Sequence, residues 1–421
     1  MSLSVKMKKN RPDLLCLGGG YESLPILQRV HELGFNPIVI DENRYCPGFE
    51  WVGDKGETWL ANCYGWQSVR IRTQKKLRWS GSIHTFYSIK GIMCCAVDAP
   101  DVQAGVAEML GLPTIGRSRA ELASNKYLQY TWLRDHNLPV PQSKLVNINF
   151  THDDAIGYDL IKPVASRGAR GVSRYTPENF KERLIEAIGE SAPGQKNAIV
   201  QKWINGVQLS TESVIRNGHV EFTAVALRNY DRLGEFSPYV IEDGCEAPYH
   251  LPPAIFQNLN SLLLRACASM GWDNLTVKGD LILDHDVLYI IELAPRLSGG
   301  YLCSHIIPLA YNFDLVKEAI YLATGKKSRG EEPERNKFVC QRYIFPRPEW
   351  YGKSIDYLPP IPEDSHLGLF TYHRRIGDRV DRVKSHAGRL GQCITFGNTQ
   401  TQARELCESV IESVTNQVKV K

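Results

Sequence analysis

Long apolar runs are missing from this 421-residue sequence. None approaches the roughly 18 residues needed to span a bilayer as a helix, which excludes an α-helical membrane protein. Strong charge of one sign is missing too: 50 Lys and Arg against 46 Asp and Glu leave a net charge of +4, which argues against nucleic acid or a membrane surface as the main partner. No repeat of fixed period and no low-complexity segment occurs, so a solenoid is excluded. The ordinary composition that remains predicts a globular protein of several structural units.

The eleven cysteines lack the spacings of a disulfide or zinc framework. Their number is odd, no C-x-x-C pair occurs, and Cys94 and Cys95 are neighbours, which is a poor geometry for a bridge. The first nine residues are basic, but no apolar signal core follows them. We therefore expect reduced, mostly buried thiols in a cytoplasmic protein.

The sequence opens with a pattern typical of a parallel α/β sheet. Asp13–Leu17 is a short apolar run, glycines occupy positions 18–20, apolar residues then recur at helical spacing up to Gly34, and Asn36–Asp41 is the next strand. A dinucleotide fingerprint would need a third glycine where Ser23 stands, although Asp41 lies at the right distance for a ribose contact. The alternatives are a phosphate or substrate edge bound at this helix N-terminus, and a purely structural turn.

Later segments of the first 140 residues continue this alternation of strand and helix. A strand is expected over 91–97 and a helix over 102–110. Ser118 and Glu121 have the spacing of a capping box, which predicts a helix from there to about Asn137. The prolines at 139 and 141 stop that helix, because proline cannot continue its hydrogen bonds.

After position 155 the pattern changes to short strands with turn signals, which predicts antiparallel sheets. Strands are expected over 158–163, 172–175, 198–204, 209–215, 220–227, 276–283 and 287–293, and the Asn217-Gly218 pair predicts a tight hairpin. A helix is expected behind Thr176 as N-cap and Pro177, with an apolar face that includes Ile185. Further helices are expected over 253–270 and from about 401 to the end.

Lys162 precedes a loop, 166–171, that contains a serine, two arginines and two glycines. Such a loop can fold its N–H groups around phosphate oxygens while Lys162 supplies a point charge. The Walker A pattern G-x-x-x-x-G-K-[ST] is absent. The alternative is an ordinary basic surface loop.

Two carboxylates follow in a predicted hairpin. If residues 284–286 form a three-residue loop, Asp280 faces Ile290, and Glu292 lies two residues further along the same sheet face. Carboxylates among apolar neighbours need a cation between them, and Mg²⁺ would meet this need with oxygen ligands. The alternative is that one carboxylate pairs with Lys278 and the other lies at a solvated edge. A two-residue loop would place the two carboxylates on opposite faces and weaken the argument for a metal.

Arg296 comes four residues after Glu292, in a stretch that ends in a glycine pair. It could stabilise a transferring phosphoryl group or bind a substrate carboxylate. Structurally, the glycine pair could simply end a strand.

These three features, in this order, resemble the ATP-grasp superfamily, and the resemblance covers nearly the whole chain. It implies an α/β and α+β multidomain protein with the ATP-grasp fold: a parallel α/β (pre-ATP-grasp) domain over 1–117, an ATP-grasp domain over 118–326 with a lid at about 126–203, and a C-terminal α+β subdomain over 327–421. Lys126 is similar to the lysine of the family that contacts nucleotide phosphates, and Lys162 matches the second such lysine. Residues 166–171 match the mobile glycine-rich loop, and Ser166, Gly168 and Gly171 are implied to bind nucleotide there.

The remaining family positions lie further along the chain. Residues 200–208 resemble the hinge that reads adenine, and the nucleotide contacts implied there are Gln201, Lys202, Trp203, Ile204 and Gln208. Asp280 and Glu292 match the Mg²⁺ carboxylates, and Arg296 matches the arginine of the E-x-N-P-R signature. The resemblance therefore implies Mg²⁺, for which Mn²⁺ could substitute, and ATP as cofactors, with Arg296 and Lys162 as catalytic residues.

Three positions depart from the family pattern. Lys202 stands where an acidic residue is frequent, and Gln208 where a ribose-binding glutamate is frequent. Ala294 replaces an asparagine metal ligand, which leaves open whether one or two ions are bound. The same E-x-A-P-R variant is familiar in the purine-biosynthetic carboxylases of the superfamily.

Residues 386–391 resemble the carboxylate–amine ligase and L-amino-acid ligase branch. This resemblance implies a ligase that joins a small-molecule carboxylate to an amine through an acyl-phosphate and releases ADP, with a homodimer favoured. Two alternatives are a purine-pathway type enzyme that acts on bicarbonate or a ribosyl-amine, and a nucleotide-binding regulatory protein. Candidate substrate contacts are Glu212, Arg228, Tyr230, Ser298 and His305.

Overall fold

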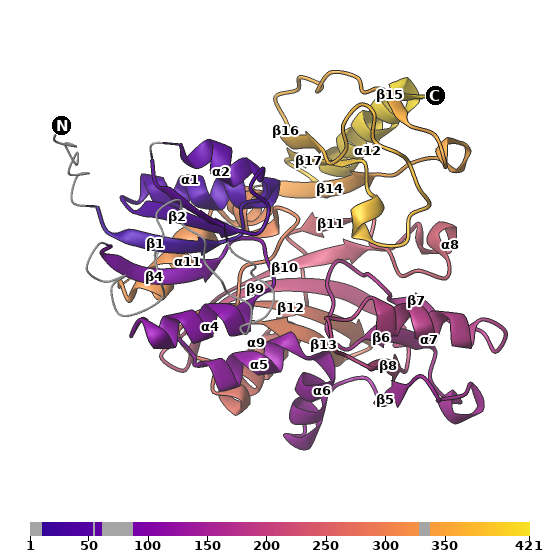
Figure 1. Cartoon of the computed structure of the whole chain (residues 1–421), viewed down its shortest axis with the longest axis horizontal. Coiled ribbons are helices and arrows are strands. Elements are labelled where there is room, and N and C mark those ends of the chain that lie inside the picture. The colour runs from indigo at the N-terminus through magenta and orange to yellow at the C-terminus, as the bar shows by residue number, and fades with distance from the viewer. Residues whose placement is uncertain (1–10, 54, 61–86, 328–336) are drawn as a thin grey trace, which may run out of the picture.

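The structure is a computed structural model that describes residues 11–53, 55–60, 87–327 and 337–421. A parallel sheet forms the N-terminal part, a small antiparallel sheet lies on another side, and a long antiparallel sheet runs through the middle into the C-terminal part (Figure 1). Within these ranges no helix has the length and apolarity that a membrane crossing requires. The predicted combination of α/β and antiparallel α+β structure is confirmed.

The N-terminal sheet is parallel, as predicted. Its spatial order is β3 (Glu57–Leu60), β2 (Asn36–Asp41), β1 (Asp13–Leu17) and β4 (Ile89–Cys94). The helices of this part are α1 (Leu24–Glu32), α2 (Pro47–Val52) and α4 (Pro100–Met109). The strand predicted over 91–97 ends at Cys94, because the backbone of Ala96 takes a left-handed conformation (φ 56°) and turns the chain away. That turn brings the residues after β4 to the carboxyl edge of the sheet.

The backbone of the glycine-rich turn after β1 is hydrogen-bonded and covered by other parts of the chain. The Gly19 N–H donates to the Asp41 carboxylate at 2.8 Å, and the Gly48 N–H of α2 donates to the Gly19 carbonyl at 2.7 Å. A Cβ on Gly19 would lie 2.5 Å from the Cys46 sulfur, so α2 covers the turn closely. Asp41 is therefore committed to the backbone rather than to a ribose, which favours the structural interpretation of this turn.

The single helix predicted from Ser118 to Asn137 is wrong in detail, because the structure has two. Helix α5 (Arg117–Ser124) has Gly116, not Ser118, as its N-cap, and α6 (Lys126–Asp135) begins after a break at Asn125. The Asn125 side chain accepts hydrogen bonds from the N–H groups of Tyr127 and Leu128, so it caps the second helix. The break makes Lys126 the first residue of α6.

We expect Asn125→Ala to lower the free energy of unfolding by about 1 kcal/mol, because two N–H groups of the first turn of α6 lose their acceptor. Urea unfolding followed by circular dichroism measures this change. Asn149→Ala, in an exposed turn, is the control and should change stability by less than about 0.5 kcal/mol. Equal stabilities of the two variants would contradict the capping role.

The small sheet has the order β5 (Ser143–Asn147), β8 (Asn197–Gln201), β6 (Leu160–Pro163) and β7 (Ser173–Arg174), and all its pairs are antiparallel. Helix α7 (Phe180–Gly189) packs on it through a core that includes Ile161 and Leu184. The helix begins three residues after the predicted start, because the Asn179 side chain accepts from the Thr176 N–H and holds residues 176–179 in a turn. Ile185 is 54% exposed, so its placement on the buried face was also wrong.

The large sheet has eight strands. In spatial order they are β13 (Val287–Ala294), β12 (Leu275–Asp284), β9 (Val207–Arg216), β10 (His219–Asn229), β11 (Gly244–Ala247), β14 (Phe338–Ile344), β17 (Gly391–Gly397) and β16 (Leu367–Tyr372). The Asn217-Gly218 hairpin is confirmed, with both residues at positive φ. Helix α9 (Pro253–Met270) has the predicted bounds and buries Leu259 and Leu263 against the sheet.

The loop of the β12–β13 hairpin is shorter than predicted, but Asp280 and Glu292 still share one sheet face, as predicted. Asp284 pairs with Val287, so the loop has two residues rather than three. On a regular ladder this would place Asp280 and Glu292 on opposite faces. A β-bulge between the Leu281–Ile290 and Asp280–Glu292 pairs adds one residue, Ile291, on β13 and restores the parity. Asp280 and Glu292 therefore stand directly opposite each other on one face.

The C-terminal part continues the same large sheet through β14, β17 and β16. Helix α12 (Gln400–Gln417), capped by Thr399, packs on β14 and β17 and confirms the predicted final helix. The remaining elements are α8 (Leu233–Phe236), α10 (Ile307–Tyr311), α11 (Leu315–Thr324), β15 (Ile355–Tyr357) and β18 (Lys419–Val420). Helix α11 packs on β4 so closely that a Cβ on Gly91 would lie 2.3 Å from the Ala323 carbonyl oxygen. This contact joins the N-terminal sheet to the rest of the molecule.

All ten cysteines in the described ranges are buried and unbridged, as predicted. Cys63 and the basic first nine residues lie outside these ranges.

Candidate active site

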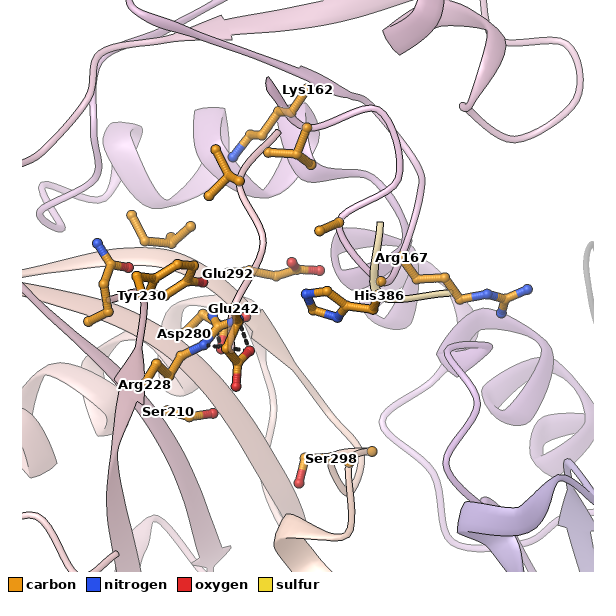
Figure 2. Close-up of a pocket in the computed structure, with 18 of the residues that line it drawn as sticks. Lys162, Arg167, Ser210, Arg228, Tyr230, Glu242, Asp280, Glu292, Ser298 and His386 are labelled. Carbon is orange, nitrogen blue, oxygen red and sulfur yellow. Dashed lines mark hydrogen bonds and ion pairs between the residues drawn. The ribbon is translucent and has the colours of Figure 1, made fainter. Parts of the chain in front are cut away.

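A cavity of about 690 Å³ lies where the three sheets meet. Its floor is one polar face of the large sheet: Gln208 and Ser210 on β9, Arg228 on β10, and Lys278 and Asp280 on β12 share that face by their register. Figure 2 shows Lys162 on the far side of the cavity from Asp280 and Arg228, with Glu292 projecting between them. The sequence-predicted residues thus come from both antiparallel sheets and meet in one space.

Lys162 is at the end of β6 and only 7% exposed. Its Nζ donates to the Gln201 side-chain oxygen at 3.1 Å, and Gln201 in turn donates to the Ser143 hydroxyl at 2.8 Å. Burial, and secondly the positive charge of Lys126, lower the pKa of Lys162 to about 8. Among the described residues no carboxylate forms an ion pair with Lys162, and a buried ammonium of this kind attracts an anion that enters the cavity.

The strand predicted over 198–204 stops at Gln201, because the chain leaves the sheet there. The Lys202 N–H donates to the Gln142 carbonyl at 2.9 Å, and the Trp203 N–H donates to the Asp159 carboxylate at 3.1 Å. Residues 201–204 line the cavity as an irregular segment, as does Gln208 just beyond it. The Gln201 carbonyl also accepts the Asp159 N–H at 3.1 Å, so the groups of this segment left for a ligand are the carbonyls of residues 202–204 and the Ile204 N–H.

The glycine-rich loop lies over the cavity. Ser166 and Gly168 line it, and the Ser166 hydroxyl is buried without a hydrogen-bond partner. Gly171 does not line the cavity: its φ is +67°, and a Cβ there would lie 3.0 Å from side-chain atoms of Pro163 and Glu190. Gly171 therefore allows the base of the loop to pack closely against Pro163 and Glu190, and it does not face the cavity.

The two opposed carboxylates are held by cations. Asp280 contacts Lys278 Nζ and lies 3.1 Å from Arg228 Nη1, and Glu292 accepts from Lys126 Nζ at 2.7 Å. Burial raises the pKa of Asp280, but the charges of Arg228 and Lys278 outweigh it and hold that pKa at about 2. Asp280 is therefore fully ionised at neutral pH.

Arg296 is paired with a residue that the sequence analysis missed. Its Nε donates to Asp98 Oδ1 at 2.8 Å, and Nη1 donates to the Leu297 carbonyl at 2.9 Å. Burial acts to raise the pKa of Asp98, but Arg296 outweighs it and the pKa is about 2. Asp98 follows β4 at the carboxyl edge of the parallel sheet, which is where such sheets bind ligands, and this position was the available signal.

The sequence analysis gave no site role to several other lining residues from distant segments, which include Glu22, Glu242, Gln341, Tyr343 and His373, and also His386 and Arg389 of the stretch 386–391. Among the candidate substrate contacts, Arg228, Tyr230 and Ser298 line the cavity. Glu212 shares the floor's sheet face by register and accepts the Ser298 N–H at 2.6 Å, but neither Glu212 nor His305 is among the lining residues. Burial raises the pKa of Glu212 to about 7.

The carboxylate pair fits a divalent cation that shares its coordination with phosphates. Asp280 Oδ1 is buried and makes no hydrogen bond, and its one close partner is Arg228 Nη1 at 3.1 Å, so it keeps capacity for a cation. Among the described residues no three His, Cys, Asp or Glu side chains form a metal-binding group. Ala294 is buried opposite Lys278 and offers no side-chain oxygen. Mg²⁺ commonly takes one or two carboxylates and completes its shell with water and phosphate, which matches two protein ligands.

A small antiparallel sheet lies over a large one, and lysines, carboxylates and arginines line the cavity between them. Residues 123–300 match the family model of the ATP-grasp domain, so the chain contains this domain. A comparison with curated proteins gave no match.

Solved structures similar to this chain span nearly its whole length. The L-amino acid ligase from Bacillus licheniformis is 17% identical, with a TM-score of 0.73 over 98% of this chain and 99% of that one. Phosphoribosylglycinamide synthetase from Anaerococcus prevotii is 17% identical, with a TM-score of 0.68 over 97% and 99%. N5-carboxyaminoimidazole ribonucleotide synthetase from Thermotoga maritima is 14% identical, with a TM-score of 0.64 over 97% and 99%. At these identities the likeness establishes the fold alone.

Proposed function

We propose that the protein is an ATP-dependent carboxylate–amine ligase that forms an amide through an acyl-phosphate and releases ADP and phosphate. The observation that supports this is the convergence of Lys162, the Asp280–Glu292 pair and Arg296 on one cavity. These groups supply an anion site, a divalent cation site and a guanidinium within one space. Phosphoryl transfer needs this set of charges and little covalent chemistry from the protein.

The nucleotide would lie with its base against residues 201–204 and its phosphates toward Lys162. The Gln208 side chain, on the floor next to this segment, would hydrogen-bond a ribose hydroxyl. Lys126, at the first position of α6, would balance phosphate charge together with Lys162. When phosphate arrives, Lys126 can leave Glu292, with which it is paired at 2.7 Å.

Asp280 and Glu292 would hold Mg²⁺. The ion, when bound, neutralises charge on the ATP phosphates. Asp280 suits this role because it is ionised, and the ion would take the place that the charges of Arg228 and Lys278 now hold beside it. Arg296, fixed by Asp98, would bind the substrate carboxylate and orient it for attack on the terminal phosphoryl group.

The loop 166–171 would exclude water, which would otherwise hydrolyse the acyl-phosphate. The Gly168 carbonyl accepts the His386 N–H at 3.0 Å, so the loop is docked on the C-terminal part of the chain. An amine that attacks the acyl carbon expels phosphate and gives the amide. No enzyme nucleophile is needed for this sequence of steps.

The test is phosphate release from ATP and Mg²⁺ across pairs of small carboxylates and amines. We expect release to require both members of one pair, and Asp280→Asn to lower kcat by on the order of 100-fold, because one ion ligand becomes neutral. Asp286→Asn, in the exposed turn of the same hairpin, is the matched control and should keep full activity. ATP binding without release in any pair would contradict the proposal and favour a regulatory nucleotide-binding protein.

Bicarbonate and ribosyl-amines belong in the same panel. Ala294 beside the metal carboxylates motivates this second candidate, a purine-pathway type reaction. Release that depends on bicarbonate, or on a ribosyl-amine as acceptor, would favour it over an amide between other small molecules.

A further inference from the structure

We propose that the segment 374–388 forms a second anion site, separate from the main cavity, and that a phosphate-class oxyanion bound there holds the loop 166–171 in its docked position. The ligand class is inorganic phosphate, pyrophosphate or a small phosphate ester. Binding of the anion is independent of the ligase function. Only the use that the protein makes of the docked loop rests on that function.

The positive charge of the whole chain is concentrated at this segment. Residues 374–389 contain six Arg and Lys against two Asp, an excess of +4. The complete sequence also has a net charge of +4, so the remaining residues contain 44 charges of each sign and balance. A local excess of this kind produces a positive potential that raises the concentration of anions around it.

A pocket of about 160 Å³ lies within this excess. Its charged lining residues are the cations Arg374, Arg379, Arg382 and Lys384 and the single acid Asp381. Among the described residues, Arg379 is the only one of the four cations with an ion pair, to Asp381 at 3.4 Å, and both side chains are exposed. Such a pair is weak in water. The pocket therefore keeps an excess of three positive charges, whose mutual repulsion a bound anion relieves.

The backbone that carries these cations is fixed by its buried neighbours. Val380 and Val383, which alternate with the charged residues, are 2% and 1% exposed. The Val380 N–H donates to the Lys353 carbonyl at 2.8 Å. A Cβ on Gly388 would lie 3.1 Å from the Val383 Cα, so the two walls of the pocket pack directly on each other. Charges on such a preorganised backbone lose little conformational freedom when an anion binds.

The charge excess matches a phosphate-class anion better than a carboxylate. A carboxylate neutralises one of the three charges, whereas doubly charged phosphate or the more highly charged pyrophosphate balances most of the excess. Arginine guanidinium groups also bind phosphate oxygens through paired hydrogen bonds. Arg379, Arg382 and Lys384 are exposed, so we expect a modest affinity that falls as ionic strength rises.

One short segment joins the pocket to the main cavity. Three residues of the segment 385–388 line the pocket, and the fourth, His386, lines the main cavity (Figure 2). The His386 N–H donates to the Gly168 carbonyl at 3.0 Å, which docks the loop 166–171 on this segment. Arg374, one of the pocket cations, donates from Nη2 to the Ala387 carbonyl. An anion that holds the pocket cations therefore also holds the segment on which the loop docks.

Calorimetric titration with pyrophosphate, without ATP or Mg²⁺, tests the site. Because Lys162 also attracts phosphate, Lys162→Met is the background in which the main cavity is weakened. We expect this variant to retain one pyrophosphate site, and the additional changes Arg379→Gln and Lys384→Gln to weaken that site at least tenfold, because two charge-assisted contacts are lost. Arg265→Gln with Lys196→Gln removes the same charge at exposed positions that do not line the pocket, and should leave the affinity unchanged.

The chemistry of the ligand is tested in the Lys162→Met background with inorganic phosphate, glycerol phosphate, acetate and a short single-stranded DNA. We expect both phosphates to bind at least tenfold more tightly than acetate. Tighter binding of glycerol phosphate would identify an ester as the occupant, and tighter binding of inorganic phosphate would identify the free anion. The DNA should bind no more tightly than pyrophosphate.

Hydrogen exchange at the His386 N–H, which reports the hydrogen bond to Gly168, tests the effect on the loop. Saturating pyrophosphate should slow this exchange at least threefold in the Lys162→Met variant. It should have no effect once Arg379 and Lys384 are also replaced. The measurement needs no turnover, so a failure of the ligase function, seen as absence of phosphate release, leaves its result unchanged.

Three results would overturn the proposal. Unchanged pyrophosphate affinity after replacement of Arg379 and Lys384 would place the anion elsewhere. Equal binding of acetate, or tighter binding of DNA through the same two residues, would exclude a small phosphate ligand. Unchanged exchange at His386 with the pocket filled would show that the anion does not hold the loop.

Discussion

Replacing Arg296 by lysine is expected to lower kcat by on the order of 1,000-fold while the protein stays folded, because we propose that the planar guanidinium orients the substrate carboxylate for its attack on the phosphoryl group. Lysine keeps the positive charge next to Asp98, so that carboxylate does not become an unpaired buried anion. It loses the planar, forked donor set, and with it the second hydrogen bond that now goes to the Leu297 carbonyl. The loss should appear in kcat rather than in nucleotide affinity.

Single-turnover phosphate release, with ATP binding measured separately by calorimetry, checks this expectation. Arg216→Lys is the matched control: Arg216 also forms ion pairs, with Glu221 and Glu318, but it does not line the cavity. The Arg216→Lys variant should have a lower free energy of unfolding than wild type, while its kcat should fall no more than a few-fold. If Arg296→Lys kept wild-type kcat, the arginine would only hold Asp98, and its catalytic role would be wrong.

The hairpin that carries Asp280 and Glu292 shows which features a sequence pattern can predict and which it cannot. The pattern located both strands and both carboxylates, but it assumed a regular ladder with a three-residue loop. The structure has a shorter loop and a bulge, two deviations that cancel. The alternation of apolar and polar residues gives no sign of the bulge, because the extra residue, Ile291, is as apolar as its neighbours in the strand. The predicted face was therefore confirmed although its derivation was not.

Cavity residues that belong to a local sequence motif were easier to predict than cavity residues that only the tertiary fold places there. Lys162 and Arg296 stand in segments whose glycines and charges are informative by themselves. Asp98 and Glu22 stand alone in their segments and reach the cavity through the fold, and Arg389 lies in the stretch 386–391 whose pattern did not indicate a place in the cavity. Asn125 shows the same limit at smaller scale, since a cap inside a helical pattern is visible only once its hydrogen bonds are known.

Lys162→Met is expected to stabilise the free protein and weaken nucleotide binding at the same time. Burial and the Lys126 charge lower the pKa of Lys162 from its ordinary 10.5 to about 8, which corresponds to about 3 kcal/mol. Below pH 8 the folded protein bears the full cost of this buried charge. Between about pH 8 and 10.5 the unfolded chain binds more protons than the folded one, so wild-type stability rises with pH across that window.

The methionine variant should therefore unfold at higher urea concentration than wild type at pH 7, by on the order of 3 kcal/mol, and this advantage should shrink as the pH approaches 10. ATP affinity should fall about 10- to 100-fold at pH 7, because a charge-assisted contact to phosphate is lost. In the wild type, affinity should decline by up to about tenfold per unit above pH 8, since bound phosphate favours protonated Lys162. Lys196→Met, at an exposed position, should change neither property. A methionine variant that is less stable and binds ATP normally would show that Lys162 serves the fold, and would remove it from the phosphate site.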